Sequence, residues 1–194
     1  MRQLVRFVVL IVAASSVALS NQPGQRSTNQ HIRKFNLKSF AYRDAVKTLR
    51  QDWAEAVKFI KEDGGKDDWV QEKNIVGFEA KSVYGDITGD GSDEAAVNVY
   101  YSLGGSGSFT CVYVYTLKDG SPSLLARVEG GDRAHGAIES VKILNGQLIV
   151  GRYRPTKDDC NACYGYIETT KYKWLGSRLV KVGVQVRKYR SKGK

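Results

Sequence analysis

The chain has 194 residues, with 30 Lys and Arg against 20 Asp and Glu, so its formal net charge is +10. This length is enough for one domain with a substantial core. The positive charge argues against inhibition of cationic lysozymes, a common role of small periplasmic β-proteins, because like charges repel.

The first 20 residues have the pattern of a secretory signal peptide. Arg2 and Arg6 precede an apolar run at 7–19, and small residues lie at positions 18 and 20. The run is too short and too close to the terminus to favour a stable membrane span. We therefore expect a signal peptide at 1–20 and a secreted or periplasmic protein, with an uncleaved N-terminal anchor as the alternative.

Residues 21–36 are expected to form a flexible spacer, because NQPGQRSTN at 21–29 is polar and carries Gly and Pro. An amphipathic helix is predicted next, with Ser39 as its N-cap and Gly64-Gly65 as its end. Its apolar residues recur at steps of three and four, so they share one face and make the helix a packing element. They are Val46, Leu49, Trp53, Val57 and Ile60.

Beyond the helix the hydrophobic period changes to about 2, which is typical of strands. Asp119-Gly120 and Asn145-Gly146 are strong signals for tight hairpin turns. Short connections favour sequential antiparallel pairing, so we predict a single α+β, mainly β domain at 37–186. It would be an antiparallel meander of about eight strands with one N-terminal helix. The predicted strands are 78–84, 95–103, 109–117, 124–128, 138–144, 147–153, 166–174 and 179–182.

The C-terminus is strongly basic. Seven Lys and Arg residues and no acidic residue lie between Arg178 and Lys194, and residues 187–194 are expected to form a basic tail. Such a segment can bind an anionic envelope polymer or lipid by its charge, and a solvated, frayed terminus is the alternative. No nucleic-acid partner is expected, because an exported protein meets little nucleic acid.

The stretch at 86–94 combines oxygen-bearing side chains with two glycines. The side chains stand at alternate positions: Asp86, Thr88, Asp90, Ser92 and Glu94. Calcium takes about 6–8 oxygen ligands, so a short loop must aim several oxygens at one point, and Gly89 and Gly91 allow the sharp turns. The strand-like flanks make this loop the tip of a hairpin. The alternative is a metal-free acidic turn in which Asp86 and Asp90 accept backbone N–H bonds.

The sequence DITGDGSDE at 86–94 resembles the DxDxDG calcium loop of the FG-GAP and VCBS repeats of integrin-like β-propellers. The resemblance implies a structural calcium ion held by side-chain oxygens of Asp86, Thr88, Asp90 and Glu94 and by the carbonyl of Ser92. Thr88 stands where Asp or Asn is usual, which implies weak affinity. The loop occurs once, whereas a propeller needs repeated blades. The whole chain also resembles small uncharacterised secreted bacterial proteins with a GDxTGDGxDEA hairpin followed by CNAC, which implies no activity.

Three cysteines are present in this exported chain. Cys160 and Cys163 form a CxxC pair that can close on itself, or one member can bridge to Cys111. A redox-active CxxC usually opens a helix, whereas this pair is predicted in a loop. Zinc needs four ligands, and only His31 and His135 could join the pair. We expect a structural disulfide between Cys160 and Cys163.

The function expected from these features is non-catalytic. The chain carries no GxSxG or HExxH signature and has only two histidines. We expect a secreted or periplasmic domain with a calcium-stabilised hairpin that binds an envelope polymer or a protein partner. The alternative is a secreted hydrolase or inhibitor-like factor that uses the loops around Asp132–Gly136, where Asp132 and His135 could form an acid–base pair.

Overall fold

The computed structural model describes residues 31–62, 75–104, 107–132, 136–155 and 165–189. A short 3-10 helix, η1 (Ile32–Lys34), precedes the single long helix of this part of the chain, α1 (Leu37–Glu62). Eight strands follow in order: β1 (Gly77–Gly85), β2 (Glu94–Ser102), β3 (Ser108–Lys118), β4 (Ser121–Asp132), β5 (Ile138–Leu144), β6 (Gln147–Arg154), β7 (Tyr166–Leu175) and β8 (Arg178–Lys188).

The strands form two antiparallel four-stranded sheets, each in sequence order. Sheet A has the order β1-β2-β3-β4, and sheet B has the order β5-β6-β7-β8. The predicted tight turns are confirmed, since Asp119 and Gly120 have φ of 51° and 75°, and Asn145 and Gly146 have φ of 51° and 68°. Positive φ at both central residues belongs to the two-residue turn whose twist matches paired strands. The mainly β fold is therefore as the sequence predicts, while the meander is divided into two sheets.

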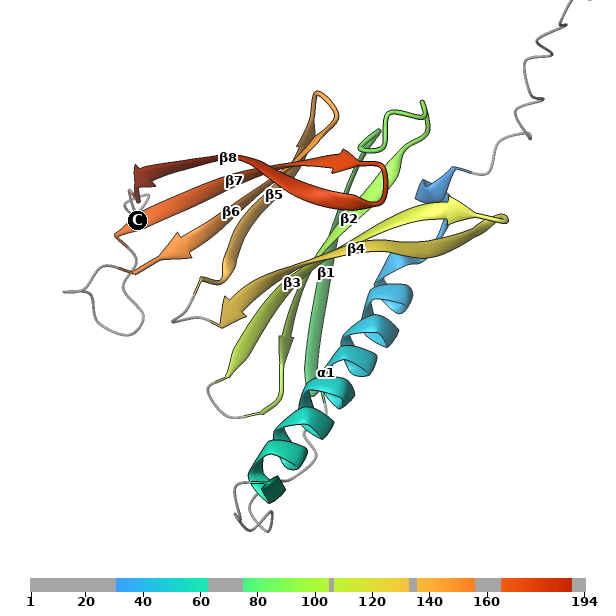
Figure 1. Ribbon diagram of the computed structural model, residues 1–194. Coiled ribbons are helices and arrows are strands. Elements are labelled where there is room, and N and C mark those ends of the chain that lie inside the picture. Colours follow the sequence, from blue (N-terminus) through green and yellow to red (C-terminus); the bar gives the residue numbers. More distant parts are fainter. Residues whose placement is uncertain (1–30, 63–74, 105–106, 133–135, 156–164, 190–194) are drawn as a thin grey trace, which may run out of the picture.

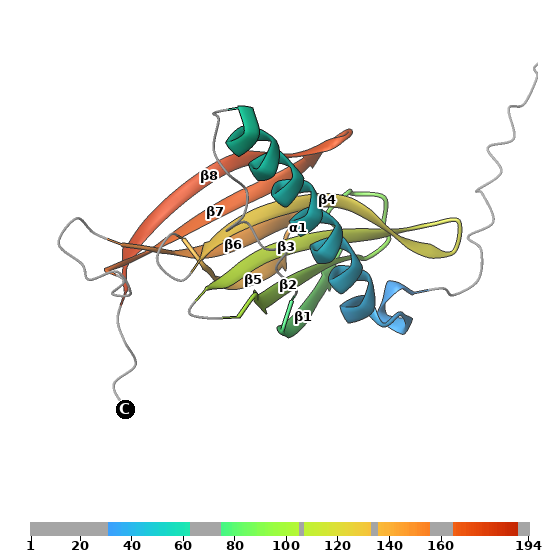
Figure 2. The same cartoon turned by 90° about the horizontal axis from the view of Figure 1, so that it is seen from below.

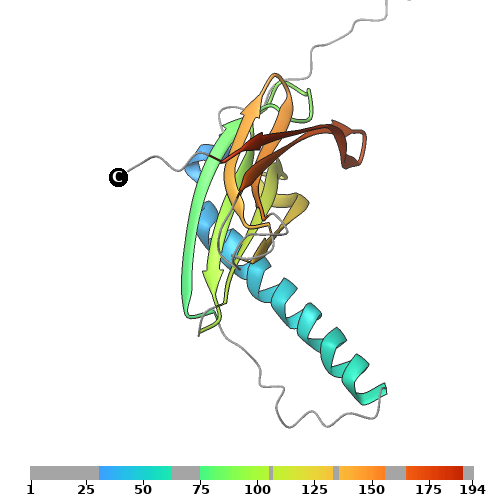
Figure 3. The ribbon, with the colours of Figure 1, turned by 90° about the vertical axis from the view of Figure 1, so that its left-hand side faces the viewer.

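The elements are arranged in layers (Figure 1). Helix α1 packs against one face of sheet A, and sheet B packs against the other face. Seen from below, α1 crosses the strands of sheet A on the side away from sheet B (Figure 2). The C-terminal end of α1 extends past the strands, which is also clear in the side view (Figure 3). None of the helices in the described ranges is long and apolar enough to cross a membrane.

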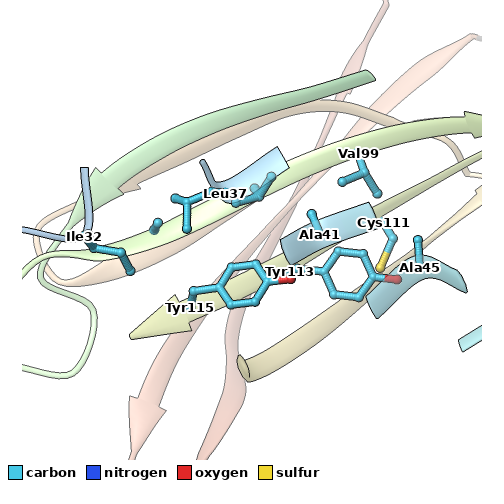
Figure 4. Close-up of a cluster of buried hydrophobic side chains, with 10 residues drawn as sticks. Ile32, Leu37, Ala41, Ala45, Val99, Cys111, Tyr113 and Tyr115 are labelled. Atoms are coloured by element: carbon cyan, nitrogen blue, oxygen red, sulfur yellow. The ribbon is translucent and has the colours of Figure 1, made fainter. Parts of the chain in front are cut away.

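The core between α1 and sheet A combines small helix residues with large strand residues (Figure 4). Leu37, Ala41 and Ala45 lie four residues apart on the helix and are all buried. They pack against Tyr113 and Tyr115 of β3, which are both 1% exposed. Alanine lets the helix approach the sheet closely enough to cover the two tyrosine rings.

The second core lies between the sheets. It contains Ala96, Val112 and Val114 of sheet A and Leu148 and Val150 of sheet B. In β2 the buried residues therefore alternate between the two cores, because successive strand side chains point to opposite faces.

Thr110 of β3 connects sheet A to β5, the first strand of sheet B. Its hydroxyl donates to the carbonyl of Gly131 at 3.1 Å and accepts the N–H of Ile138 at 2.9 Å. A second connection is made by Arg152 of β6, whose Nη2 donates to the carbonyl of Glu129 at 2.7 Å. These bonds hold β5 and β6 against β3 and β4, although no ladder connects the two sheets within the described ranges.

The helix boundaries differ in detail from the prediction. Helix α1 begins at Leu37, so Ser39 lies inside its first turn and is not the N-cap, and Asn36 precedes the helix instead. Val46 and Leu49 are only half-buried, and the fully buried positions lie nearer the N-terminus. Ile32, within the stretch expected to be a spacer, is 1% exposed and belongs to the core.

Candidate metal loop at the β1–β2 hairpin

The loop at 86–93 joins β1 to β2, which confirms the predicted hairpin. Gly85 pairs with Glu94 as the last rung of the ladder, so the loop starts from a fixed base. Gly89 and Gly91 both have φ of 83°, in the region that side chains other than glycine rarely adopt. The two glycines fold the loop back on itself.

Asp86 and Asp90 hold the loop backbone. Oδ1 of Asp86 accepts the N–H of Gly89 at 2.6 Å, and its Oδ2 accepts the N–H of Gly91 at 2.9 Å. Oδ1 of Asp90 accepts the N–H of Ser92 at 2.7 Å. These are the bonds expected of the acidic turn, in which each carboxylate replaces a missing backbone partner.

Glu94 lies at the base of the loop and is fully buried. Its Oε2 accepts the backbone N–H of Ile87 at 2.8 Å and that of Thr88 at 3.0 Å. Its Oε1 lies 3.2 Å from the hydroxyl of Thr116 on β3 and 3.4 Å from the hydroxyl of Thr88. A buried carboxylate is tolerated only when its oxygens are satisfied, and four donors surround this one.

The environment of Glu94 affects its protonation. Burial raises the pKa of the Glu94 carboxyl above its ordinary value, because the charged form loses its hydration. The hydrogen bonds from Ile87, Thr88 and Thr116 favour the charged form and oppose this shift, whereas the negative charge of Asp90 adds to it. Desolvation is the largest of these effects.

Asp93, the last residue of the loop, is paired with the N-terminal segment. Nη2 and Nε of Arg33 lie 2.7 Å and 3.0 Å from Oδ2 of Asp93. The same guanidinium lies over the ring of Tyr84, 4.7 Å from its centroid. The pair is too exposed to add much stability, but it connects η1 to the end of the hairpin.

The structure therefore places the predicted oxygen-bearing residues in one hairpin but gives them different positions. Asp90 and Ser92 are exposed, Asp86 and Thr88 are half-buried, and Glu94 is buried beneath the loop. Among the described residues, no group of three or more His, Cys, Asp or Glu side chains is placed to hold a metal ion. Any ion here would need hydroxyl, carbonyl or water oxygens in addition to carboxylates.

Sequence reasoning missed two partners of this loop, Thr116 and Arg33. Both are distant from the loop in sequence, and nothing in the residues around them marks them as partners. The β2–β3 register, which pairs Ala95 with Tyr115, brings Thr116 beside Glu94. Arg33 reaches Asp93 only because Ile32 is anchored in the core.

Other predicted sites lie partly outside the described residues. Cys160, Cys163 and His135 all lie outside them, so their disulfide and acid–base roles stay predictions. Cys111 is described, and it is a free, buried thiol that bridges to no other cysteine. Burial raises its pKa to about 12, so the thiol stays protonated at neutral pH.

A shallow, open groove runs along the exposed side of α1. It is formed by a single helix and is mostly apolar, with Arg43, Lys47 and Arg50 at its margins. No acidic residue or histidine lines it, so it lacks the paired groups that general acid–base catalysis needs.

The fold and the loop define the class as a two-sheet antiparallel β-domain that carries one helix and an acidic hairpin. No family model, no curated protein and no solved structure matches the chain.

Proposed function

We propose that this protein is an exported, non-catalytic binding domain with a calcium-stabilised β1–β2 hairpin and an anionic partner in the cell envelope. The observation that supports the calcium component is that Asp86 and Asp90 lie in one short loop, whose backbone their carboxylates hold in shape by hydrogen bonds. A preorganised loop loses less conformational entropy when it binds an ion.

The two aspartates retain the capacity to bind calcium. An ionised carboxylate offers about four lone-pair sites, and Asp86 uses two of them for the N–H groups of Gly89 and Gly91. Asp90 uses one for Ser92. The remaining sites, with the Thr88 hydroxyl, the Ser92 carbonyl and water, would form an oxygen shell.

Glu94 has a different role in this proposal. Its four neighbouring donors already occupy about four lone-pair sites, so a calcium ion would have to displace a hydroxyl such as that of Thr116. We therefore assign Glu94 to the base of the loop, which it holds, and not to the oxygen shell. With only two carboxylates the affinity would be weak, on the order of 10⁻⁴–10⁻³ M, as in extracellular modules.

The anionic partner is supported by the charge of the C-terminal segment. The described strand β8 carries Arg178, Lys181, Arg187 and Lys188 and no acidic residue. Because β8 lies at the edge of sheet B, these cations are accessible to a partner. Export is supported by the signal-peptide pattern at 1–20, which lies outside the described residues.

Calorimetric titration with calcium tests the metal component. We expect millimolar binding by the natural protein and at least a tenfold loss in Asp90→Asn, which removes a charge but can still accept the Ser92 N–H. Asp119→Asn, in the exposed β3–β4 turn, is the matched control and should bind calcium normally. Absence of heat up to about 5 mM calcium would refute the calcium proposal.

Glu94→Gln then separates the two roles of this residue. If Glu94 only holds the loop, the amide keeps an acceptor for Ile87 and Thr88, and calcium affinity should change less than about threefold. A loss as large as that of Asp90→Asn would make Glu94 a ligand.

A further inference from the structure

Strand β8 has one paired side and one free side. It is the terminal strand of sheet B, and its only ladder within the described residues is the one with β7. A free strand edge presents a row of unpaired N–H and C=O groups that can pair with another extended chain. In Figure 1, β8 lies at the outside of sheet B, and its C-terminal end runs away from sheet A.

The ladder shows which backbone groups face outward. The N–H of Tyr189 donates to the carbonyl of Gly165 at 2.8 Å, one rung beyond the pair formed by Tyr166 and Lys188. In an antiparallel ladder, hydrogen-bonded and non-hydrogen-bonded pairs alternate. The N–H and C=O groups of Val184, Val186 and Lys188 therefore point away from β7, toward the free edge.

The same segment carries exposed apolar side chains. Val184 and Val186 are 47% and 48% exposed, and Tyr166 beside them on β7 is 37% exposed. Val184 pairs with Thr170, which is fully buried, so these side chains lie on the face of sheet B that packs against sheet A. The packing ends before it reaches the outer edge, and the valines are left uncovered.

The charge around this edge is positive. Arg187 and Lys188 follow Val186 directly, and β8 contains no acidic residue. The nearest acidic residue on β7 is Glu168, opposite Val186, and it is paired with Arg154 at 3.5 Å. In a β8–β8 pair between two copies every charge contact would be repulsive, so the edge is protected from self-pairing and selects an acidic strand.

We propose that the free edge of β8 from Val184 to Lys188 binds an extended acidic segment of another protein by strand addition. This inference rests on the proposed anionic partner and names its class. In an antiparallel arrangement the added strand would place acidic residues opposite Lys188 and Arg187 and apolar residues opposite Val186 and Val184. Backbone bonds would supply affinity, and the alternation would supply specificity.

Fluorescence anisotropy with a labelled peptide that contains the run Glu-Glu-Val-Thr-Val tests this inference on the purified protein. We expect saturable binding, and at least tenfold weaker binding of the same peptide with proline in place of the first valine, which lies opposite Val186 and points its N–H at β8. Proline lacks the N–H and cannot join a ladder from within a strand. Equal binding of both peptides would overturn the inference.

Substitution at Val186 tests the same edge from the protein side. Val186→Pro removes an outward N–H and leaves the ladder with β7 intact, because proline is tolerated where the missing N–H faces solvent. We expect at least tenfold weaker peptide binding, whereas Val186→Thr should bind as the natural protein does. Circular dichroism and the melting temperature report whether each variant is folded.

A charge exchange keeps the inference testable should the proline variant not fold. Arg187→Glu with Lys188→Glu should weaken binding of the acidic peptide and strengthen binding of a peptide with lysine in place of glutamate. No change with either peptide would overturn the inference.

Two further measurements distinguish an acidic strand from other partners that could bind the free edge of β8. The first is binding to phosphatidylglycerol vesicles. If the natural protein and Val186→Pro bind the vesicles equally and neither binds the peptide, the anionic partner is supported but strand addition is overturned. If light scattering shows a dimer of the natural protein and a monomer of Val186→Pro, the edge binds a second copy of the chain. This result would also overturn strand addition by an acidic segment. Absence of binding to peptide and vesicles would refute the anionic partner itself, while the calcium titration stands independently.

Discussion

The backbone N–H of Ile87 donates to Oε2 of Glu94 at 2.8 Å, so the residue that begins β2 holds the second residue of the loop before it. The contact joins the two ends of the loop, and both Ile87 and Glu94 are buried. It makes the loop conformation depend on a side chain of the core as well as on the glycines of the turn.

This contact predicts different results for two substitutions of Glu94. Glu94→Ala leaves the N–H groups of Ile87 and Thr88 buried without an acceptor, which should cost about 2–4 kcal/mol of unfolding free energy. Glu94→Gln keeps an acceptor and avoids the desolvation of a charge, so it should lie within about 1 kcal/mol of the natural protein. Urea denaturation measures both. Equal losses in the two variants would show that the charge, and not the hydrogen bonding, holds the loop.

The raised pKa of Glu94 predicts the sign of its pH dependence. A raised pKa means that the folded state binds the proton more tightly than the unfolded state. The contribution of Glu94 to stability is therefore complete below its ordinary pKa of 4.5 and is lost as pH rises through the higher folded value. The unfolding free energy of the natural protein minus that of Glu94→Gln should fall as the pH rises above 4.5. A rise over this range would contradict the dominance of desolvation.

The sequence predicted much of the hairpin and little of what surrounds it. Local features, namely the glycines at 89 and 91 and the strand-like flanks, were enough to place the loop and its turn. The role of Glu94 was not predicted, because its burial depends on Thr116, whose position is set by strand register. In the sequence, Glu94 and Asp90 both stand in the alternating series of oxygen-bearing residues and so look like equivalent ligands. In the structure Glu94 is buried, whereas Asp90 is exposed.

The division of the strands into two sheets was also not predicted from the sequence. All eight strands were predicted at their places in the chain, because each is bounded by turn residues or a change of period. The predictions at 124–128 and 179–182 were too short, since β4 and β8 extend over 121–132 and 178–188, and β8 includes the first two residues of the predicted tail. Whether β4 pairs with β5 depends on Thr110, which binds Gly131 and Ile138 and so turns the chain from one sheet to the next. That contact is one threonine hydroxyl between residues distant in sequence, and no periodicity reveals it.

The buried thiol of Cys111 leads to a prediction about reactivity. Because burial raises its pKa to about 12, almost no thiolate is present at pH 8, and the side chain is also inaccessible. We expect no alkylation of Cys111 by iodoacetamide in the folded protein and complete alkylation in urea, as measured by peptide mapping. A cysteine introduced by Ser121→Cys at the exposed β3–β4 turn should react in both conditions. Fast labelling of Cys111 in the folded state would show that the α1–sheet A core opens readily.

The junction at Thr110 predicts that Gly130 of β4 tolerates no side chain. A Cβ at Gly130 would lie 2.7 Å from the carbonyl oxygen of Thr110 and 2.8 Å from Cγ1 of Ile138, closer than real Cβ contacts. Gly130→Ala must therefore displace β3 or β5, and we expect a loss of about 2–4 kcal/mol in urea denaturation.

Gly77→Ala is the matched control for this prediction. Gly77 also lies in a strand, and its added Cβ would meet only the Cβ of Ser102, at 3.9 Å. This variant should be neutral or slightly stabilising, because alanine reduces the entropy of the unfolded chain. If the two substitutions had equal effects, Thr110 and Ile138 would not enclose Gly130 as tightly as the distances in the structure indicate.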